Sequence, residues 1–214
     1  MSGYQDTQIP RYPFYKIMKP KKKTIILTLA AFAIFLLPRV VSLGWDITSY
    51  DCRYWQPRMR NFWEDGILGG DLRETYQKYH PGVTLMWTSG AANQLFDLAG
   101  RVVLGHDLQH MPRWYPLRHF ATKFPLVFLI SAAGAICFYF IRRLTNTKFA
   151  LFFAVFLSLE PFFLGTSRFL HLSGLTAMLM FASFVVMYFY VQHEAAAGKT
   201  RPIPQPPPTC RERF

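Results

Sequence analysis

Residues 24–37 read TIILTLAAFAIFLL and form an unbroken apolar run. With residues 38–44 this run reaches the length of about 20 residues that a helix needs to cross a hydrocarbon core of about 30 Å. Three further apolar segments contain a single charged residue, Glu160, among them: 124–141, 149–165 and 172–191. The sequence therefore predicts an all-α integral membrane protein with four transmembrane helices.

A long polar loop, residues 45–123, separates the first two predicted spans. It is rich in Trp, Tyr, Arg and Asp, and it holds eight of the twelve carboxylates of the chain. The mean hydropathy of +0.13 is low for a membrane protein because it averages four spans with this loop and with a Pro-rich tail at residues 193–214. Since the spans offer few polar groups, we expect any chemistry to lie in the loop.

The distribution of Lys and Arg predicts the orientation, because short segments rich in these residues stay in the cytoplasm. Residues 1–23, the turn 142–148 and the tail after residue 191 have a combined net charge of +10, whereas the 45–123 loop has a net charge of +1. We therefore expect both termini in the cytoplasm and the loop on the extracytoplasmic side, with the short turn 166–171. Most of the net charge of +12 then serves to orient the chain in the membrane, and no nucleic-acid partner is expected.

The N-terminus also fits a cleaved signal peptide, because Ser42-Leu43-Gly44 offers a small-x-small cleavage site after an apolar core. The 23 residues before that core are many for a signal peptide, so we expect a retained anchor in the membrane domain, residues 24–192. The loop is extracytoplasmic in either case. The three cysteines are far apart, in a loop, a span and the tail, and predict no disulfide framework.

Helical spacing recurs within the loop. Trp55, Met59 and Phe62 stand at i, i+4 and i+7, which predicts a short helix with an aromatic face and with Arg58 off that face. Helical spacing resumes over residues 83–104, where polar residues interrupt the apolar ones. We expect both segments to be amphipathic interfacial helices on the membrane surface.

Asp51 stands at the predicted start of the first loop helix. A carboxylate there can cap the helix, or it can act as a general base toward an acceptor hydroxyl, and Asp46 is a second candidate for either role. His80 lies in a turn, where a histidine serves structure or function. The residues show no clustered carboxylates and no thiol pair with metal-ligand spacing, so we expect neither a metal nor another cofactor.

Three stretches follow one another along the chain: SYDCRYWQPRMRNF from Ser49, TYQKYHPGVTLMW from Thr75 and EPFFLGTSRFLHLSGL from Glu160. Together they resemble the N-terminal part of polyprenyl-phosphate-sugar-dependent glycosyltransferases of the protein O-mannosyltransferase type. These enzymes have many spans and the GT-C fold. The resemblance covers residues 24–191 and places the three stretches on the expected side of the membrane.

The resemblance implies transfer of a sugar from a polyprenyl phosphate to a hydroxyl of a protein or glycan acceptor, with inversion at the anomeric carbon. Asp51 would be the base, and membrane lipid would deliver the donor substrate. A cation would stabilise the charge of the leaving phosphate. The resemblance implies these substrate-binding and lipid-phosphate-binding residues: Arg58, Arg60, His80, Arg168 and His171. Glu160, which stands where the family has Asp, and Asp46, the second candidate named above, are expected in support.

The chain departs from the family pattern at acidic positions. The Asp-Glu pair of the family reads Asp51-Cys52 here, and the last Asp of Arg-x-Leu-His-Leu-Asp is Ser173. Glu160 and Arg168 are expected at the outer end of the last hairpin of spans, where they either pair with each other or serve the substrate.

The sequence also predicts where two arginine side chains near the outer ends of the spans lie. Arg168 and His171 are three residues apart, so they would share a helical face if the fourth span begins there. Arg39 is expected to snorkel outward as an anchor.

Family members are longer, so the four spans are expected to be the N-terminal part of such an enzyme. The chain would then be a truncated product, or a partner chain would supply the missing spans. The alternative is a non-catalytic membrane subunit whose outer loop binds a partner, and the two lost acids favour it. A transporter or channel is less well supported, because no predicted span has the polar stripe of a permeation path.

Overall fold

The computed structural model of the chain describes residues 22–46, 50, 52–77, 82–106, 108 and 111–199. Helices and turns account for nearly all of these residues, and no strand occurs among them. The predicted all-α class is therefore confirmed for the part of the chain that the structure describes.

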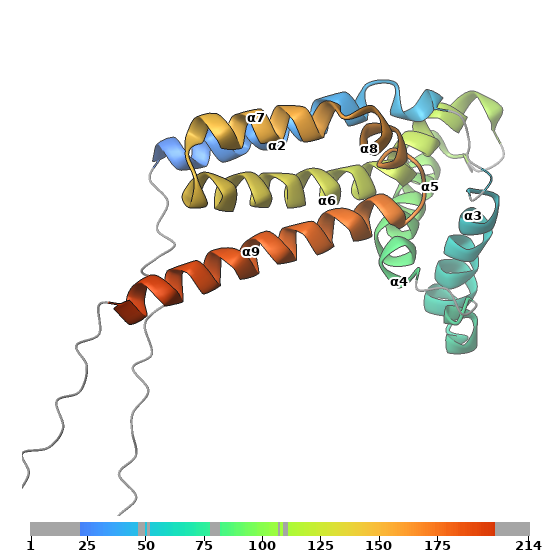
Figure 1. The fold of residues 1–214 in the computed structure, drawn as a ribbon. Helices are drawn as coiled ribbons and strands as arrows, with labels where there is room; N and C mark the ends of the chain where they lie inside the picture. The colour runs from blue at the N-terminus through green and yellow to red at the C-terminus, as the bar shows by residue number, and fades with distance from the viewer. Residues whose placement is uncertain are drawn as a thin grey trace, which may run out of the picture.

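Four helices form a bundle (Figure 1): α2 (Lys22–Val40), α6 (Tyr115–Leu144), α7 (Thr147–Leu159) and α9 (Ser173–Lys199). Helix α6 is central, since it contacts the other three. Helices α2 and α7 run from the end of the bundle that holds Lys22 and Lys199 to the other end, and α6 and α9 run back. We call the end where α6 and α9 begin the loop end, because the described residues between α2 and α6 gather there.

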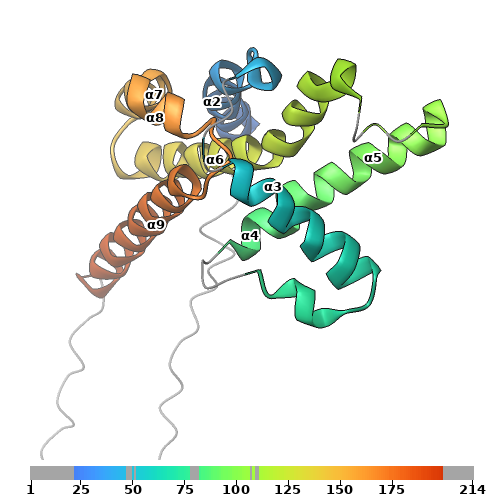
Figure 2. The same ribbon diagram turned by 90° about the vertical axis from the view of Figure 1, so that its right-hand side faces the viewer.

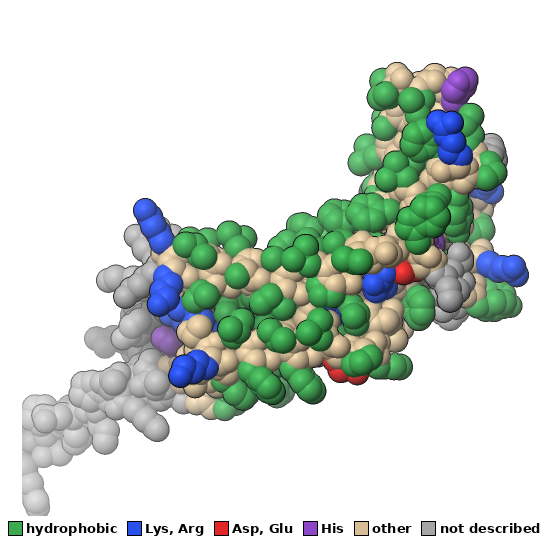
Figure 3. Space-filling view, turned by 90° about the horizontal axis from the view of Figure 1, so that it is seen from above, with side chains coloured by type: hydrophobic (Ala, Val, Ile, Leu, Met, Phe, Trp, Pro, Cys, Tyr) green, Lys and Arg blue, Asp and Glu red, His purple; other side chains and the backbone are tan. Residues whose placement is uncertain are grey.

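Three helical segments among the described residues are long and apolar enough to cross a membrane: Lys22–Trp45, Pro112–Leu144 and Ser173–His193. They correspond to the first, second and fourth predicted spans. Figure 3 shows hydrophobic side chains over the visible face of this bundle. Exposed residues such as Leu29 and Phe156 contribute to the apolar surface of the bundle, as expected of helices that face lipid.

The third predicted span, residues 149–165, is not one helix. Helix α7 ends at Leu159, and a separate helix α8 (Pro161–Thr166) follows. Pro161 has no N–H to continue α7, and the Glu160 carboxylate accepts hydrogen bonds from the first backbone N–H groups of α8. The 13 residues of α7 extend about 20 Å, which is less than the thickness of a hydrocarbon core.

Arg39 does not snorkel outward as expected. Its side chain is fully buried near the end of α2, where Nε donates to Ser167 Oγ at 2.9 Å and Nη1 donates to the Phe35 oxygen at 2.8 Å. The break between α7 and α8 brings Ser158 and Ser167 over the guanidinium, so the partners lie inside the protein. The ring of Phe163 adds a cation–π contact at 5.0 Å.

The loop residues form two helical units at the loop end. The first is α3 (Cys52–Asn61), which continues as a wider π-helical segment, Phe62–Leu68. The second is α4 (Val83–Leu85), which continues through a π-helical segment, Met86–Gly90, into α5 (Ala91–Leu104). Short 3₁₀ turns lie before, between and after the two units: Leu43–Trp45, Leu72–Thr75 and Pro112–Trp114. Both segments that the sequence predicts to be helical are thus helical.

Aromatic contacts join the two units. The predicted aromatic face of α3 is buried, as shown by Trp55, Met59 and Phe62. Trp63 Nε1 donates to the Met86 oxygen at 2.8 Å, and its ring lies edge-on to Trp87 with centroids 5.3 Å apart. These contacts hold α3 against the start of the second unit.

Helix α5 lies across the direction of the bundle and extends away from it (Figures 1 and 2). Its polar residues Asn93 and Asp97 are buried toward α6, whereas Leu95, Leu98 and Val102 are exposed. The buried face of α5 is thus polar and its exposed face apolar, which is the reverse of a surface helix in a soluble protein. An apolar outer face is what a helix on a membrane surface needs.

Candidate functional site

Asp46 is the centre of a charged cluster at the loop end. The Arg168 guanidinium donates to both of its carboxylate oxygens, at 3.0 Å from Nε to Oδ2 and 2.6 Å from Nη2 to Oδ1. Arg168 also donates to the backbone oxygens of Pro38 and Val41, at 3.2 and 2.7 Å. Lys123 Nζ of α6 lies 3.7 Å from Asp46 Oδ2. The cluster therefore joins the end of α2, the start of α6 and the segment that precedes α9.

Arg168 does not pair with Glu160, which is one of the two alternatives expected for these side chains. Its carboxylate partner is Asp46 and not Glu160, because Glu160 caps α8 through Phe162 and Phe163. Arg168 and His171 also do not share a helical face, since residues 167–172 form turns and α9 begins only at Ser173. Both carboxylate oxygens of Asp46 are thus engaged by cationic side chains.

Two polar side chains of α6 lie nearly fully buried beside this cluster. Lys123 is 1% exposed and His119 is 2% exposed. Within the described residues, neither Lys123 Nζ nor the His119 ring nitrogens have a hydrogen-bond partner. The His119 ring stacks on Tyr115 with centroids 5.4 Å apart. Lys123 has Asp46 as its ion-pair partner, whereas the His119 ring nitrogens have none among the described residues. Buried polar groups without partners are costly, so the His119 ring is suited to meet a ligand.

Asp51 and His80, the predicted base and the predicted turn histidine, lie outside the described residues. Asp51 immediately precedes Cys52, which is the fully buried first residue of α3. The hydroxyls of Tyr50 and Tyr54 are 2.9 Å apart, and this hydrogen bond raises the pKa of Tyr50.

A groove of about 460 Å³, which we call the Trp55 groove, opens between α3 and the start of α9. Trp55, His171 and Ser173 line its polar part, and His171 Nδ1 accepts a hydrogen bond of 3.1 Å from the Ser173 N–H. Ala177 and Met180 of α9 line its apolar part, together with Leu172 and Thr176. The groove thus joins polar groups at the loop end to the apolar surface of a spanning helix.

Trp55 is a meeting point of separate parts of the sequence. Gly82 lies directly against its ring, because a Cβ at this position would be 2.1 Å from Trp55 Cζ3. His171 lines the same groove. The guanidinium carbon of Arg58 lies 5.1 Å from the Trp55 ring centroid. The three stretches that carry the family resemblance therefore contribute residues to one place.

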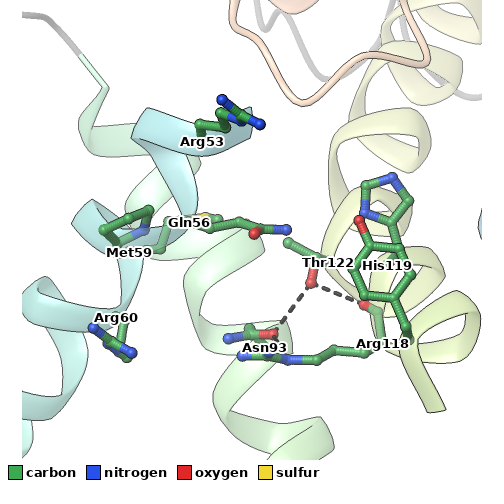
Figure 4. Close-up of a pocket in the computed structure, with 10 residues that line it drawn as sticks. Arg53, Gln56, Met59, Arg60, Asn93, Arg118, His119 and Thr122 are labelled. Atoms are coloured by element: carbon green, nitrogen blue, oxygen red, sulfur yellow. Dashed lines mark hydrogen bonds between the residues drawn. The ribbon is translucent and has the colours of Figure 1, made fainter. Parts of the chain in front are cut away.

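A second cavity of about 330 Å³, which we call the arginine cavity, lies between α3, α5 and α6 (Figure 4). It shares no lining residue with the Trp55 groove. Three of its lining residues are arginines, and one of these, Arg60, is a predicted substrate-binding residue. The side chains that define it are Arg53, Gln56, Arg60, Asn93, Arg118, His119 and Thr122.

Arg53, Arg118, His119 and Lys123 belong to these sites although no sequence pattern described above identifies them. The sequence does contain a signal, since Pro116 marks the first turn of a helix, which begins at Tyr115 and not at residue 124. That start places His119 and Lys123 one turn apart on one face. The arginines come together only through contacts between three helices, for which no local signal exists.

His106 and His110 have the i, i+4 spacing of a histidine pair that can bind a metal on a helix. His110 lies outside the described residues. Within the part of the chain that the structure describes, no three His, Cys, Asp or Glu side chains lie close enough to hold a metal ion.

Comparison of the chain with protein-family models, with curated proteins and with solved structures gives no match. The functional proposals therefore rest on the residues and on the geometry of the two cavities.

The contact between Gly82 and Trp55 yields a first prediction. Gly82→Ala places a methyl group against the indole, so either Trp55 or the backbone at residue 82 must move. We expect a loss of about 1–3 kcal/mol in the free energy of unfolding, measured by thermal denaturation in detergent micelles. Gly165→Ala is the matched control, because a Cβ at residue 165 meets open space. Equal stability of the two variants would contradict the contact.

Proposed function

We propose that the chain acts in the transfer of a sugar from a polyprenyl phosphate to a hydroxyl acceptor on the extracytoplasmic side of a membrane. The observation that carries the proposal is the Trp55 groove, to which all three family-like stretches contribute directly or through contact with Trp55. The proposal includes the GT-C type of enzyme, both termini in the cytoplasm and α7 with α8 as a fourth membrane-crossing segment.

The groove has the polarity that a lipid-linked sugar requires. A polyprenyl chain can follow the apolar side of α9, where Met180 is 69% exposed. The sugar and the phosphate would then reach the loop end, where the Trp55 ring offers a stacking surface and His171 a hydrogen-bonding group. Arg58, which lies on Trp55, is the cation placed to stabilise the leaving phosphate.

The charged cluster supports Asp51 as the base. Asp46 is fixed by Arg168 and Lys123, and Cys52 is fully buried, so described residues on both sides of Asp51 in the sequence are held in place. Asp46 itself is occupied by its two cationic partners. Asp51 then takes the proton of the acceptor hydroxyl while that oxygen attacks the anomeric carbon and the lipid phosphate leaves.

A second candidate function is a non-catalytic membrane subunit whose loop binds a partner. The exposed apolar face of α5, with Leu95, Leu98 and Val102, favours this function because such a face is also suited to a protein contact. Cys52, in place of the second acid of the family pair, favours it as well. Dependence of sugar transfer on Asp51 distinguishes the two functions.

The second prediction concerns Asp51. Asp51→Asn should lower sugar transfer from a radiolabelled polyprenyl-phosphate sugar, in membranes that contain the chain, by about 10²-fold or more, because the amide cannot accept the proton. Asp65→Asn is the control, since Asp65 is exposed and lines neither cavity. Transfer that is absent, or that is the same with Asn at position 51, would sink the catalytic function and leave the subunit function.

The third prediction concerns the donor. Ala177→Trp fills the apolar part of the Trp55 groove and should raise the KM for the lipid donor about tenfold. Met187→Trp is the control, because Met187 is exposed on the same helix but does not line the groove. A KM that both variants leave unchanged, with transfer intact, would place the donor elsewhere.

A further inference from the structure

We propose that the arginine cavity is a binding site for a phosphate-bearing anion, separate from the Trp55 groove. This inference does not depend on the proposed sugar transfer, because the two cavities share no lining residue. Its ligand is a phosphate ester, which either a soluble molecule or a lipid head group can supply.

The lining of the arginine cavity is positively charged. Arg53, Arg60 and Arg118 line the cavity, and no carboxylate lines it. Within the described residues, neither Arg53 nor Arg60 forms an ion pair. Guanidinium groups bind phosphate oxygens in pairs of parallel hydrogen bonds, so a cavity with this lining favours phosphate over neutral ligands.

Arg118 is the fixed member of the three arginines. Its Nη2 lies 3.6 Å from Asp97 Oδ2, and its Nε donates to Asn93 Oδ1 at 3.0 Å. Thr122 Oγ1 donates to the Arg118 oxygen at 2.9 Å and is 3.3 Å from Asn93 Oδ1 (Figure 4). One wall of the cavity is therefore pre-ordered by polar contacts between α5 and α6, which lowers the cost of ordering it around a ligand.

His119 supplies the second, independent observation. Its side chain lines the cavity, is 98% buried and has no hydrogen-bond partner for either ring nitrogen among the described residues. The contact with Tyr115 engages only the face of the ring. A ring held in this way is suited to donate an N–H to an anionic oxygen. Lys123, one turn further along α6, is also buried but pairs with Asp46 and does not line the cavity.

The exposed arginines make the test practical. The full-length chain in nanodiscs of neutral phosphatidylcholine is titrated with inorganic phosphate, and heat is measured by calorimetry. Replacement of both Arg53 and Arg60 by Gln should weaken binding at least about tenfold, because charge-assisted hydrogen bonds are lost. The matched control replaces Arg73 and Arg101, which are exposed and line no part of the cavity, by Gln.

A second arm identifies the source of the phosphate. The same variants are placed in nanodiscs of phosphatidylcholine with and without phosphatidate, and the phosphatidate that stays bound to the chain after extraction with detergent is measured. Saturable binding of inorganic phosphate that needs Arg53 and Arg60 indicates a soluble ester, whereas binding that needs phosphatidate and the same arginines indicates a lipid head group. The proposal is overturned if neither probe binds saturably, or if the Arg73 and Arg101 control loses as much binding as the cavity variant.

Discussion

The ion pair between Asp46 and Arg168 is the interaction on which the loop end depends. Arg168 connects the carboxylate to two backbone oxygens at the end of α2, and Lys123 connects it to α6. Without this pair, the segment before α9 would have no ion pair to the rest of the loop end among the described residues. Fixed geometry at the loop end is what the proposed donor site and the proposed base require.

Two cavities of opposite character flank α3. The Trp55 groove continues onto the apolar surface of α9, whereas the arginine cavity is bounded by the polar sides of α5 and α6. Helix α5 makes this contrast possible, because its polar residues Asn93 and Asp97 face the bundle and its apolar residues face outward. A lipid-borne substrate and a phosphate-bearing anion can thus approach the loop end from different sides without competing for the same side chains.

The sequence predicts what local patterns determine. Apolar runs identify three helices of spanning length, and the spacing of Trp55 and Met59 predicts the buried face of α3. The Glu-Pro pair at residue 160 already contains the signal for the break after α7. The pairing of Asp46 with Arg168 joins residues 122 positions apart, so no local pattern announces it. Arg39 is buried because Ser158 and Ser167 come from another hairpin, which a rule for an isolated helix in lipid cannot include.

A double-mutant cycle on Asp46 and Arg168 measures how strongly this ion pair holds the loop end together. Asp46→Asn, Arg168→Gln and the double variant are compared with the unchanged chain, with the free energy of unfolding measured in detergent micelles. We predict a coupling energy of about 1–3 kcal/mol. Either substitution alone already breaks the ion pair, so the second one adds little further loss of stability. Stabilities that add to within about 0.5 kcal/mol would show that the pair does not hold the loop end together.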